Sequence, residues 1–187
     1  MKQAQVLTER DIKEILAYVI RSAYPARNRC MFQLMLYSGM RVGEIAALNK
    51  GDVINEDGRV REQIQLKPHQ TKGSKARTVL LNTQARWELD LYLRGDRRSA
   101  DQALFLSKVG KRFSANSLVQ VLGRLYAGCG FNAATSHSTR RTFITTLAHK
   151  GVNVRVLAAL AGHSNISTTQ RYIDLNENVM RAAVELI

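Results

Sequence analysis

The spacing of apolar residues predicts α-helices over most of this 187-residue chain. Thr8 has the side chain of a good N-cap, and apolar residues recur at helical intervals from Ile12 to Ile20. A second helix is predicted from Pro25 to Gly39, because proline suits the first turn and glycine ends helices. The same pattern predicts helices over residues 41–48, 83–94, 114–127, 139–149, 152–161, 167–175 and 176–187.

In the middle of the chain the periodicity changes to that of β-strands. Segments 60–66 and 77–81 are predicted to pair as antiparallel strands, joined by a basic loop with Gly73 near its tip. Residues 103–106 are a candidate for a third short strand. We find neither an internal repeat nor a linker that would separate domains. The sequence therefore predicts one domain, residues 1–187, that is mainly α with a small antiparallel β-sheet (α+β).

The charge of the chain indicates its partner. There are 28 Lys and Arg against 15 Asp and Glu, which gives a formal net charge of +13. These basic residues are spread among apolar positions and are not gathered in a tail, which favours a folded surface that binds nucleic acid. A ribosomal or membrane-surface protein is the alternative that charge alone leaves open.

Cysteine use and hydropathy indicate the compartment. Cys30 and Cys129 both stand beside apolar neighbours, so we expect reduced thiols in the core and no disulfide. The N-terminal segment contains no apolar signal core, and no apolar run approaches the ~18 residues of a membrane span. We therefore predict a cytoplasmic protein without membrane association.

Four residues in the C-terminal part of the chain form a candidate site. His137, Arg140, His163 and Tyr172 follow one another at intervals of 3, 23 and 9 residues. A tyrosine hydroxyl, with a pKa of about 10, is a weak nucleophile at neutral pH. Its attack becomes favourable when cations neutralise the target, and a phosphodiester suits such a cluster. Tyr172 lies in a polar stretch, whereas the other tyrosines lie in apolar helical patterns typical of a core.

Other chemistries have no comparable pattern in this sequence. Asp52, Glu56, Asp57 and Asp174 do not form the carboxylate cluster of a metal-dependent nuclease. The sequence contains no Cys-x-x-Cys or paired-histidine helix for zinc, and no Gly-x-x-x-x-Gly-Lys-Ser/Thr loop for a nucleotide. We therefore expect neither a metal nor another cofactor.

The order of these residues resembles a known active site. His-x-x-Arg, then Gly-His, then a tyrosine nine residues later, is similar to the C-terminal half of the site of the tyrosine recombinase (phage integrase) family. The segment from Gly39 through Arg41 to Leu48 resembles the family's first arginine motif. The resemblance covers the chain from about Thr8 onward and implies the fold of the family's catalytic domain. It also implies an enzyme that cleaves and rejoins DNA through a covalent 3′-phosphotyrosine, without metal or ATP.

The resemblance implies a role for each matched residue. Arg41 and Arg140 would bind the phosphate oxygens, because guanidinium groups hold phosphate bidentately and stay charged. His137 would assist proton transfer, and His163 would donate a hydrogen bond to the scissile phosphate. Tyr172 would be the nucleophile.

The lysine of the family's site has two candidates here. Segment 71–77 resembles the family's hairpin, whose first lysine is the general acid toward the 5′-oxygen. That lysine maps to Lys72, with Lys75 as the alternative. If neither lysine is catalytic, the segment is a solvated basic turn. Glu44, one helical turn after Arg41, either orients this arginine or forms only an i,i+3 ion pair with it.

The chain departs from the family pattern at its start. Most members carry an N-terminal helical domain that clamps the other face of the DNA, and Arg41 comes too early to leave room for it. The chain therefore resembles the short single-domain members, such as the fimbrial-switch recombinases, unless it is a fragment of a longer protein. The resemblance implies double-stranded DNA as substrate, a homotetramer on two DNA sites, a monomer when free, and accessory DNA-bending proteins.

The last predicted helix has an apolar stripe. We expect residues 176–187 to dock on a neighbouring protomer in the DNA-bound assembly, with packing against the chain's own domain as the alternative. Two other functions also stay open: a catalytically inactive DNA-binding regulator on the same fold, and a type IB topoisomerase-like enzyme that relaxes DNA as a monomer. Sequence does not distinguish integration, excision, inversion and dimer resolution.

Overall fold

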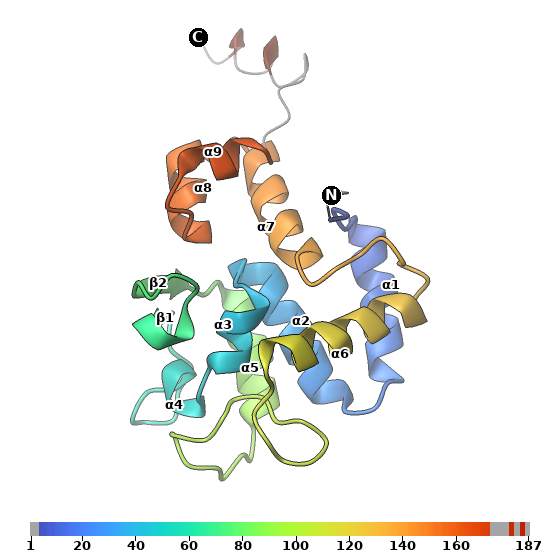
Figure 1. Ribbon diagram of the computed structural model, residues 1–187, viewed down its shortest axis with the longest axis vertical. Coiled ribbons are helices and arrows are strands. Elements are labelled where there is room, and N and C mark those ends of the chain that lie inside the picture. The colour runs from blue at the N-terminus through green and yellow to red at the C-terminus, as the bar shows by residue number, and fades with distance from the viewer. Residues whose placement is uncertain (1–3, 173–179, 182–183, 186–187) are drawn as a thin grey trace.

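The computed structural model describes residues 4–172, 180–181 and 184–185. Figure 1 shows α7, α8 and α9 gathered at one end, with the strands and α3 facing them across the middle of the molecule. The prediction of a mainly helical domain with a small sheet is confirmed. In chain order the elements are α1 (Glu9–Ile20), α2 (Pro25–Ser38), α3 (Val42–Ala47), α4 (Lys50–Val53), β1 (Gln63–Leu66), a 3₁₀ turn (Pro68–Gln70), β2 (Arg77–Leu80), α5 (Thr83–Leu93), α6 (Ala115–Gly128), α7 (Ser138–His149), α8 (Val154–Ala161) and α9 (Ile166–Gln170).

Capping residues fix the bounds of the first two helices. The Thr8 hydroxyl accepts a hydrogen bond from the Asp11 N–H at 3.1 Å, and the Asp11 carboxylate accepts one from the Thr8 N–H at 2.9 Å. Helix α2 begins at Pro25 and ends where Gly39 takes a left-handed φ of 62°. A Cβ at Gly39 would lie 2.5 Å from the Phe143 ring, so this glycine also lets α2 approach α7 closely.

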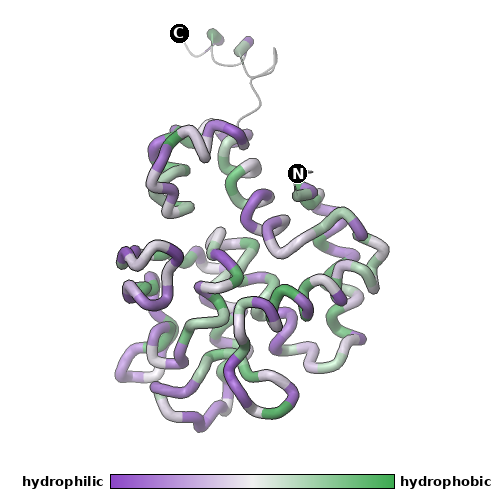
Figure 2. Tube along the Cα trace, viewed as in Figure 1, coloured by the Kyte–Doolittle hydropathy of each residue, from purple (hydrophilic) through white to green (hydrophobic). Residues whose placement is uncertain are grey.

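Helix α2 forms the centre of the core. It packs against α1, α5 and α7, and four of its apolar side chains have no exposed surface: Met31, Phe32, Leu34 and Met35. Hydrophobic and hydrophilic residues alternate along the surrounding helices, as the colours of the tube in Figure 2 show. The last residues of α2 therefore lead a rigid backbone directly into the Arg41 motif.

The sheet is a two-stranded antiparallel ribbon. Gln63 pairs with Leu80, and Leu66 pairs with Arg77. Ile64 and Val79 are paired partners and are both buried, so one face of the ribbon packs on the core. The connection between the strands, which carries the two candidate lysines, is exposed from residue 72 to residue 76. The predicted pair of strands is confirmed, with shorter bounds.

The predicted third strand is wrong. Residues 103–106 make only isolated bridges, from Ala103 to Asn49 and from Leu106 to Arg112. Leu104 and Phe105 are buried in succession, without the alternation of a half-buried strand. The Leu104 N–H donates to the Leu48 carbonyl, so the segment lies against the connection between α3 and α4 and does not join the ribbon.

The remaining predictions concern the C-terminal part and the thiols. Helix α9 covers the first part of the predicted helix 167–175, and residues 173–175 lie outside the described residues. Most of the predicted helix 176–187 also lies outside them, so its docking stays a prediction.

Cys30 is a buried free thiol and Cys129 a half-buried one. In the described part of the chain, no helix has both the length and the hydropathy to cross a membrane.

Candidate active site

Arg41 is the N-cap residue of α3 and is half-buried. Its backbone N–H donates to Glu44 Oε2 at 2.8 Å, and its Nη1 donates to Glu44 Oε1 at 3.1 Å. Its Nη2 donates to the Gly162 carbonyl at 3.1 Å. Glu44 therefore orients Arg41, and the contact is more than a surface ion pair because the Glu44 side chain is fully buried.

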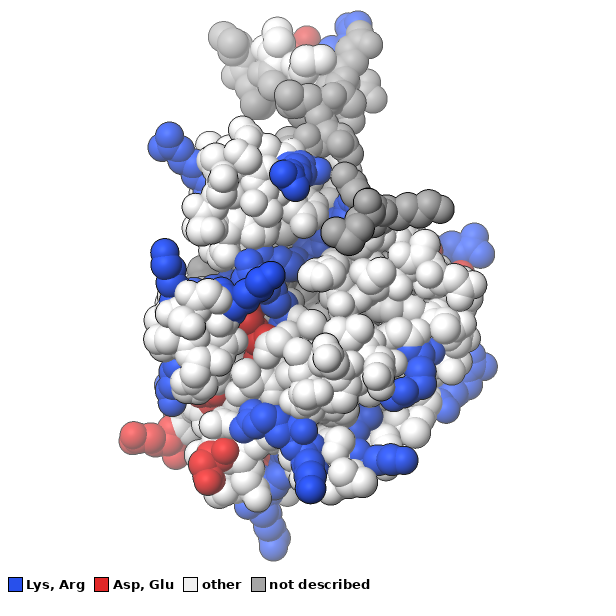
Figure 3. Space-filling view, in the orientation of Figure 1, with Lys and Arg blue, Asp and Glu red and all other residues white. Residues whose placement is uncertain are grey.

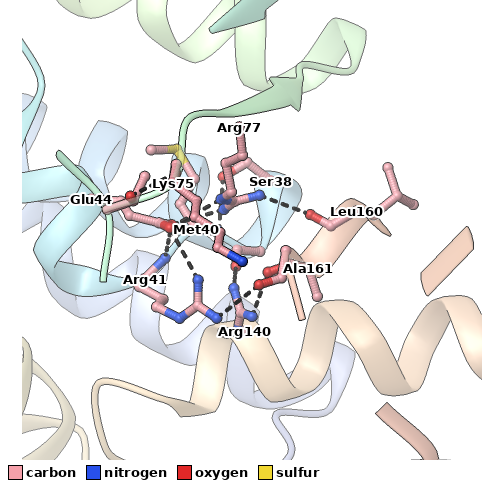
Figure 4. A network of polar contacts seen from close by, with 12 residues as sticks. Ser38, Met40, Arg41, Glu44, Lys75, Arg77, Arg140, Leu160 and Ala161 are labelled. Carbon is pink, nitrogen blue, oxygen red and sulfur yellow. Dashed lines mark hydrogen bonds and ion pairs between the residues drawn. The ribbon is translucent and has the colours of Figure 1, made fainter. Parts of the chain in front are cut away.

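Arg140 lies in the first turn of α7 and is 4% exposed. Its Nη1 donates to the Gly39 carbonyl at 2.6 Å, and its Nη2 donates to the Ala161 carbonyl at 2.5 Å. Burial, followed by the charge of Arg41, lowers the pKa of Arg140 to about 10. The guanidinium group therefore stays charged at neutral pH and joins the end of α2 to the end of α8 (Figure 4).

The end of α8 binds three arginines. The carbonyls of Leu160, Ala161 and Gly162 accept hydrogen bonds from Arg77, Arg140 and Arg41, one from each. The last carbonyls of a helix have no partner inside the helix and carry its negative dipole end, so they are suited to guanidinium donors. This arrangement gathers three positive charges before any phosphate is present. Figure 3 shows Lys and Arg side chains collected in the hollow at this level of the molecule.

Three like charges in one place need a counter-charge, and Glu44 supplies it. Arg77 donates from Nε and Nη2 to the two Glu44 oxygens at 3.0 and 2.8 Å. Burial alone would raise the pKa of Glu44, but the hydrogen bonds and charges of Arg77 and Arg41 hold it below its usual value. Glu44 is therefore ionised and supplies the negative charge beside the arginines.

His163 and Tyr172 lie next to each other beyond the end of α8. Gly162 takes a left-handed φ of 63° and turns the chain so that His163 follows the helix end directly. His163 Nδ1 lies 2.8 Å from the Thr169 hydroxyl, and its ring stacks on the Tyr172 ring with centroids 6.1 Å apart. Burial, followed by the charges of Arg140, Arg41 and Arg77, lowers the pKa of His163 to about 4. Its ring is therefore neutral at neutral pH.

His137 is the N-cap residue of α7, so it precedes the helix that contains Arg140. It is exposed, whereas Arg140 is buried. Together with Arg41 and Lys72 it lines a pocket of about 370 Å³. The structure therefore brings Arg41, Lys72 and His137 to one pocket, and it joins Arg41, Arg140 and His163 through the end of α8.

Both candidate lysines are exposed, on the loop that connects β1 to β2. Lys72 lines the pocket beside Arg41, and the Lys75 carbonyl accepts a hydrogen bond from the Thr71 hydroxyl at 2.7 Å. In Figure 4 the Lys75 side chain extends over the arginine cluster toward Arg140 and Ala161. The geometry keeps both as candidates for the general acid.

Sequence patterns missed Arg77 and Thr169. Arg77 is one of several basic residues in its segment, and no motif distinguishes it. Thr169 is buried and contacts His163, but a threonine in a polar stretch gives no signal of such a role. Among the described residues, no group of three or more His, Cys, Asp or Glu is placed to hold a metal ion.

Comparison with known proteins gives matches over nearly the whole chain. The tyrosine recombinase XerC of Roseiflexus castenholzii is 32% identical over 181 residues, which cover 92% of this chain and 55% of that protein. The tyrosine recombinase XerD of Oceanobacillus iheyensis is 29% identical over 178 residues, covering 91% of this chain and 58% of the relative. The chain spans little more than half the length of these relatives.

Solved structures share the fold. The XerA recombinase superposes with a TM-score of 0.77 at 25% identity, covering 100% of this chain and 64% of the other. The Tn1549 transposon integrase, solved in complex with circular intermediate DNA, has a TM-score of 0.76 at 21% identity and covers 99% and 67% of the two chains. The sequence profile of the phage integrase family matches residues 5–179. This match spans the whole constellation described above, and the chain belongs to the phage integrase family.

Proposed function

We propose that this chain is the catalytic domain of a tyrosine site-specific recombinase, which cleaves and rejoins DNA strands. The observation that carries the proposal is the end of α8, where two motif arginines bind successive carbonyls. One residue further lies His163, whose ring stacks on Tyr172. A buried carboxylate, Glu44, pairs with Arg41 and Arg77 and supplies the negative charge beside this cluster.

The proposed reaction exchanges one phosphoester bond for another. The Tyr172 hydroxyl attacks the scissile phosphorus, its oxygen forms the new P–O bond, and the bond to the 5′-oxygen breaks. His137 assists removal of the tyrosine proton, and the hairpin lysine gives a proton to the leaving 5′-oxygen. A 3′-phosphotyrosine and a 5′-hydroxyl result. Attack by the 5′-hydroxyl of a partner strand reverses the step and rejoins DNA, so no ATP is needed.

The arginines and His163 stabilise the charge that develops on the phosphate. Arg41 and Arg140 bind the non-bridging oxygens with the N–H groups that α8 and Glu44 leave available. In the protein without DNA the His163 ring is neutral at neutral pH, and in this form it can donate a hydrogen bond without a positive charge. When the Thr169 hydroxyl donates to Nδ1, the proton of the neutral ring stands on Nε2, where it can donate to the phosphate.

We infer double-stranded DNA as the substrate from the charge of +13 and from relatives solved with DNA. Those relatives include XerH bound to its difH substrate and a lambda integrase dimer bound to a core site. We propose a monomer when free and a homotetramer on two DNA sites, assisted by accessory DNA-bending proteins, in the cytoplasm. Arg41, Lys72, His137, Arg140, His163 and Tyr172 are the proposed catalytic residues.

A covalent adduct tests this function. The chain is incubated in EDTA with nicked duplexes, drawn from the DNA around its gene and from a randomised pool. We expect a protein–DNA adduct that survives denaturation and maps to Tyr172 by mass spectrometry, because the arginines supply the charge that a metal would otherwise provide. An adduct that needs Mg²⁺ contradicts the mechanism. DNA binding without an adduct indicates a regulator, and relaxation of supercoiled DNA without recombinants indicates a topoisomerase-like enzyme.

The two lysines can be distinguished with a bridging sulfur at the 5′-position of the scissile phosphate. A thiol, with a pKa of about 8.5, leaves without protonation and makes the general acid unnecessary. We expect Lys72→Ala to slow cleavage of ordinary DNA by about 10²–10⁴-fold and to regain wild-type rate on the sulfur substrate. Lys75→Ala is the matched control. If only Lys75→Ala regains the wild-type rate on the sulfur substrate, Lys75 is the general acid. If neither variant regains it, the loop is a solvated basic turn without a catalytic lysine.

A further inference from the structure

Arg77 is the first residue of β2, and its side chain is directed inward. Only 12% of the side chain is exposed. Its Nε and Nη2 bind both oxygens of Glu44, and its Nη1 donates to the Leu160 carbonyl at 3.1 Å. All three guanidinium nitrogens of Arg77 therefore bind protein atoms. Its side chain is also less exposed than that of Arg41, 12% against 27%, so it is less available to DNA.

The Glu44 carboxylate is shared between two arginines. It accepts from the Arg41 backbone N–H and from Arg41 Nη1 while it holds the forked contact with Arg77. A forked contact fixes the plane of a carboxylate, because both oxygens are held at once. The orientation of Glu44, and through it that of Arg41, therefore depends on Arg77.

Arg77 also fixes the base of the lysine hairpin against α8. It is paired with Leu66 in the ribbon, and the loop with Lys72 and Lys75 ends one residue before it. A Cβ at Gly162 would lie 2.7 Å from Arg77 Cδ, so the Arg77 side chain lies directly against the Gly162 backbone. Arg77 is thus part of the ribbon, and its side chain contacts both α3, through Glu44, and the end of α8.

We propose that Arg77 is a positioning residue for the reaction: it fixes Glu44, and thereby Arg41, and it holds the hairpin that carries the general-acid lysine against the end of α8. The proposal rests on the function proposed above. Arg77 acts through these neighbours and does not itself contact the phosphate.

The test is Arg77→Gln, with Arg29→Gln as matched control. Arg29 makes the same forked contact to a buried glutamate, Glu88, at 2.9 and 2.8 Å, but it joins α2 to α5 away from the site. We expect both variants to lower the melting temperature. Below both transitions and at saturating DNA, only Arg77→Gln should slow adduct formation, by about 100-fold, because misplaced catalytic groups cost that much. Equal rates in the two variants overturn the proposal.

Two further variants separate positioning from bulk charge. Arg77→Lys keeps the charge but has a single nitrogen, so we expect it to stay slow. In an Arg41→Gln background, Arg77→Gln should slow the reaction less than it does alone, since the part of its effect that passes through Arg41 is already lost. A rescue by lysine, or a full multiplication of the two effects, contradicts the assigned role.

Crystal structures of Arg77→Gln and Arg29→Gln give a readout that does not depend on cleavage. We expect the Arg41 side chain to leave the Gly162 carbonyl in the first variant and to keep it in the second. A wild-type chain that forms no adduct, with Arg41 displaced in Arg77→Gln, overturns the proposed function and supports the positioning. A wild-type chain that forms adducts, with Arg41 unmoved in Arg77→Gln, overturns the positioning alone.

Discussion

Tyr172→Phe should abolish covalent adduct formation while DNA binding persists. The substitution removes the attacking oxygen and leaves the ring that stacks on His163. We expect the rate of adduct formation to fall by about 10⁴-fold or more, which is the loss typical of a missing nucleophile. Gel shift on the same duplexes should give the wild-type Kd, because a phenol oxygen contributes little of the phosphate-dominated affinity.

Tyr24→Phe is the control for this experiment. Tyr24 bears a hydroxyl like Tyr172, but it is exposed whereas Tyr172 is half-buried, and it lies at the start of α2. The Tyr24→Phe variant should form adducts at the wild-type rate. Adducts formed by Tyr172→Phe, or lost in Tyr24→Phe, contradict the assignment of the nucleophile.

Arg140→Lys should lose most of the cleavage rate although the charge is kept. The Arg140 guanidinium spans from the Gly39 carbonyl to the Ala161 carbonyl, and one ammonium nitrogen cannot reach both and a phosphate oxygen as well. We expect single-turnover adduct formation to slow by about 10²–10³-fold, the cost of removing one donor to a developing charge. The rate is measured at saturating DNA, so weaker binding does not enter.

Arg98→Lys is the matched control for Arg140→Lys. The Arg98 guanidinium also donates to two backbone carbonyls, those of Ala103 and Leu104, but it lies in the connection after α5. Both variants lose a fork that ties backbone segments together, so both should be less stable. Only Arg140→Lys should be slow while folded, and a wild-type rate for it would show that the fork is not used on the phosphate.

The sequence was sufficient for features that depend on local residues or on fixed spacing. Thr8, Pro25 and Gly39 fix helix ends through their own backbone chemistry, and the structure confirms those ends. The third strand failed because Leu104 and Phe105 form a buried apolar run, which is compatible with a strand but does not require one. Only the position of the segment against α3 and α4 decides its structure.

The site was predictable as a set of residues but not as an assembly. Spacing gave His137, Arg140, His163 and Tyr172, and the predicted helix 139–149 placed His137 before it, yet nothing in the sequence indicated that the pKa of His163 is lowered. Arg77 was not predicted, because its contact with Glu44 joins residues 33 positions apart. Such contacts follow from packing, and a single sequence does not display them.

The three carbonyls at the end of α8 also restrict how the length of this segment can change. Each helical residue turns the backbone by about 100°, so one residue inserted into α8 would rotate all three acceptors away from their arginines. The connection before α8, residues 150–153, is largely exposed and contributes no acceptor to the arginines, although Asn153 caps α8. Insertions and deletions between Arg140 and His163 are therefore tolerable only in that connection, which matters for anyone who aligns, grafts or redesigns this segment.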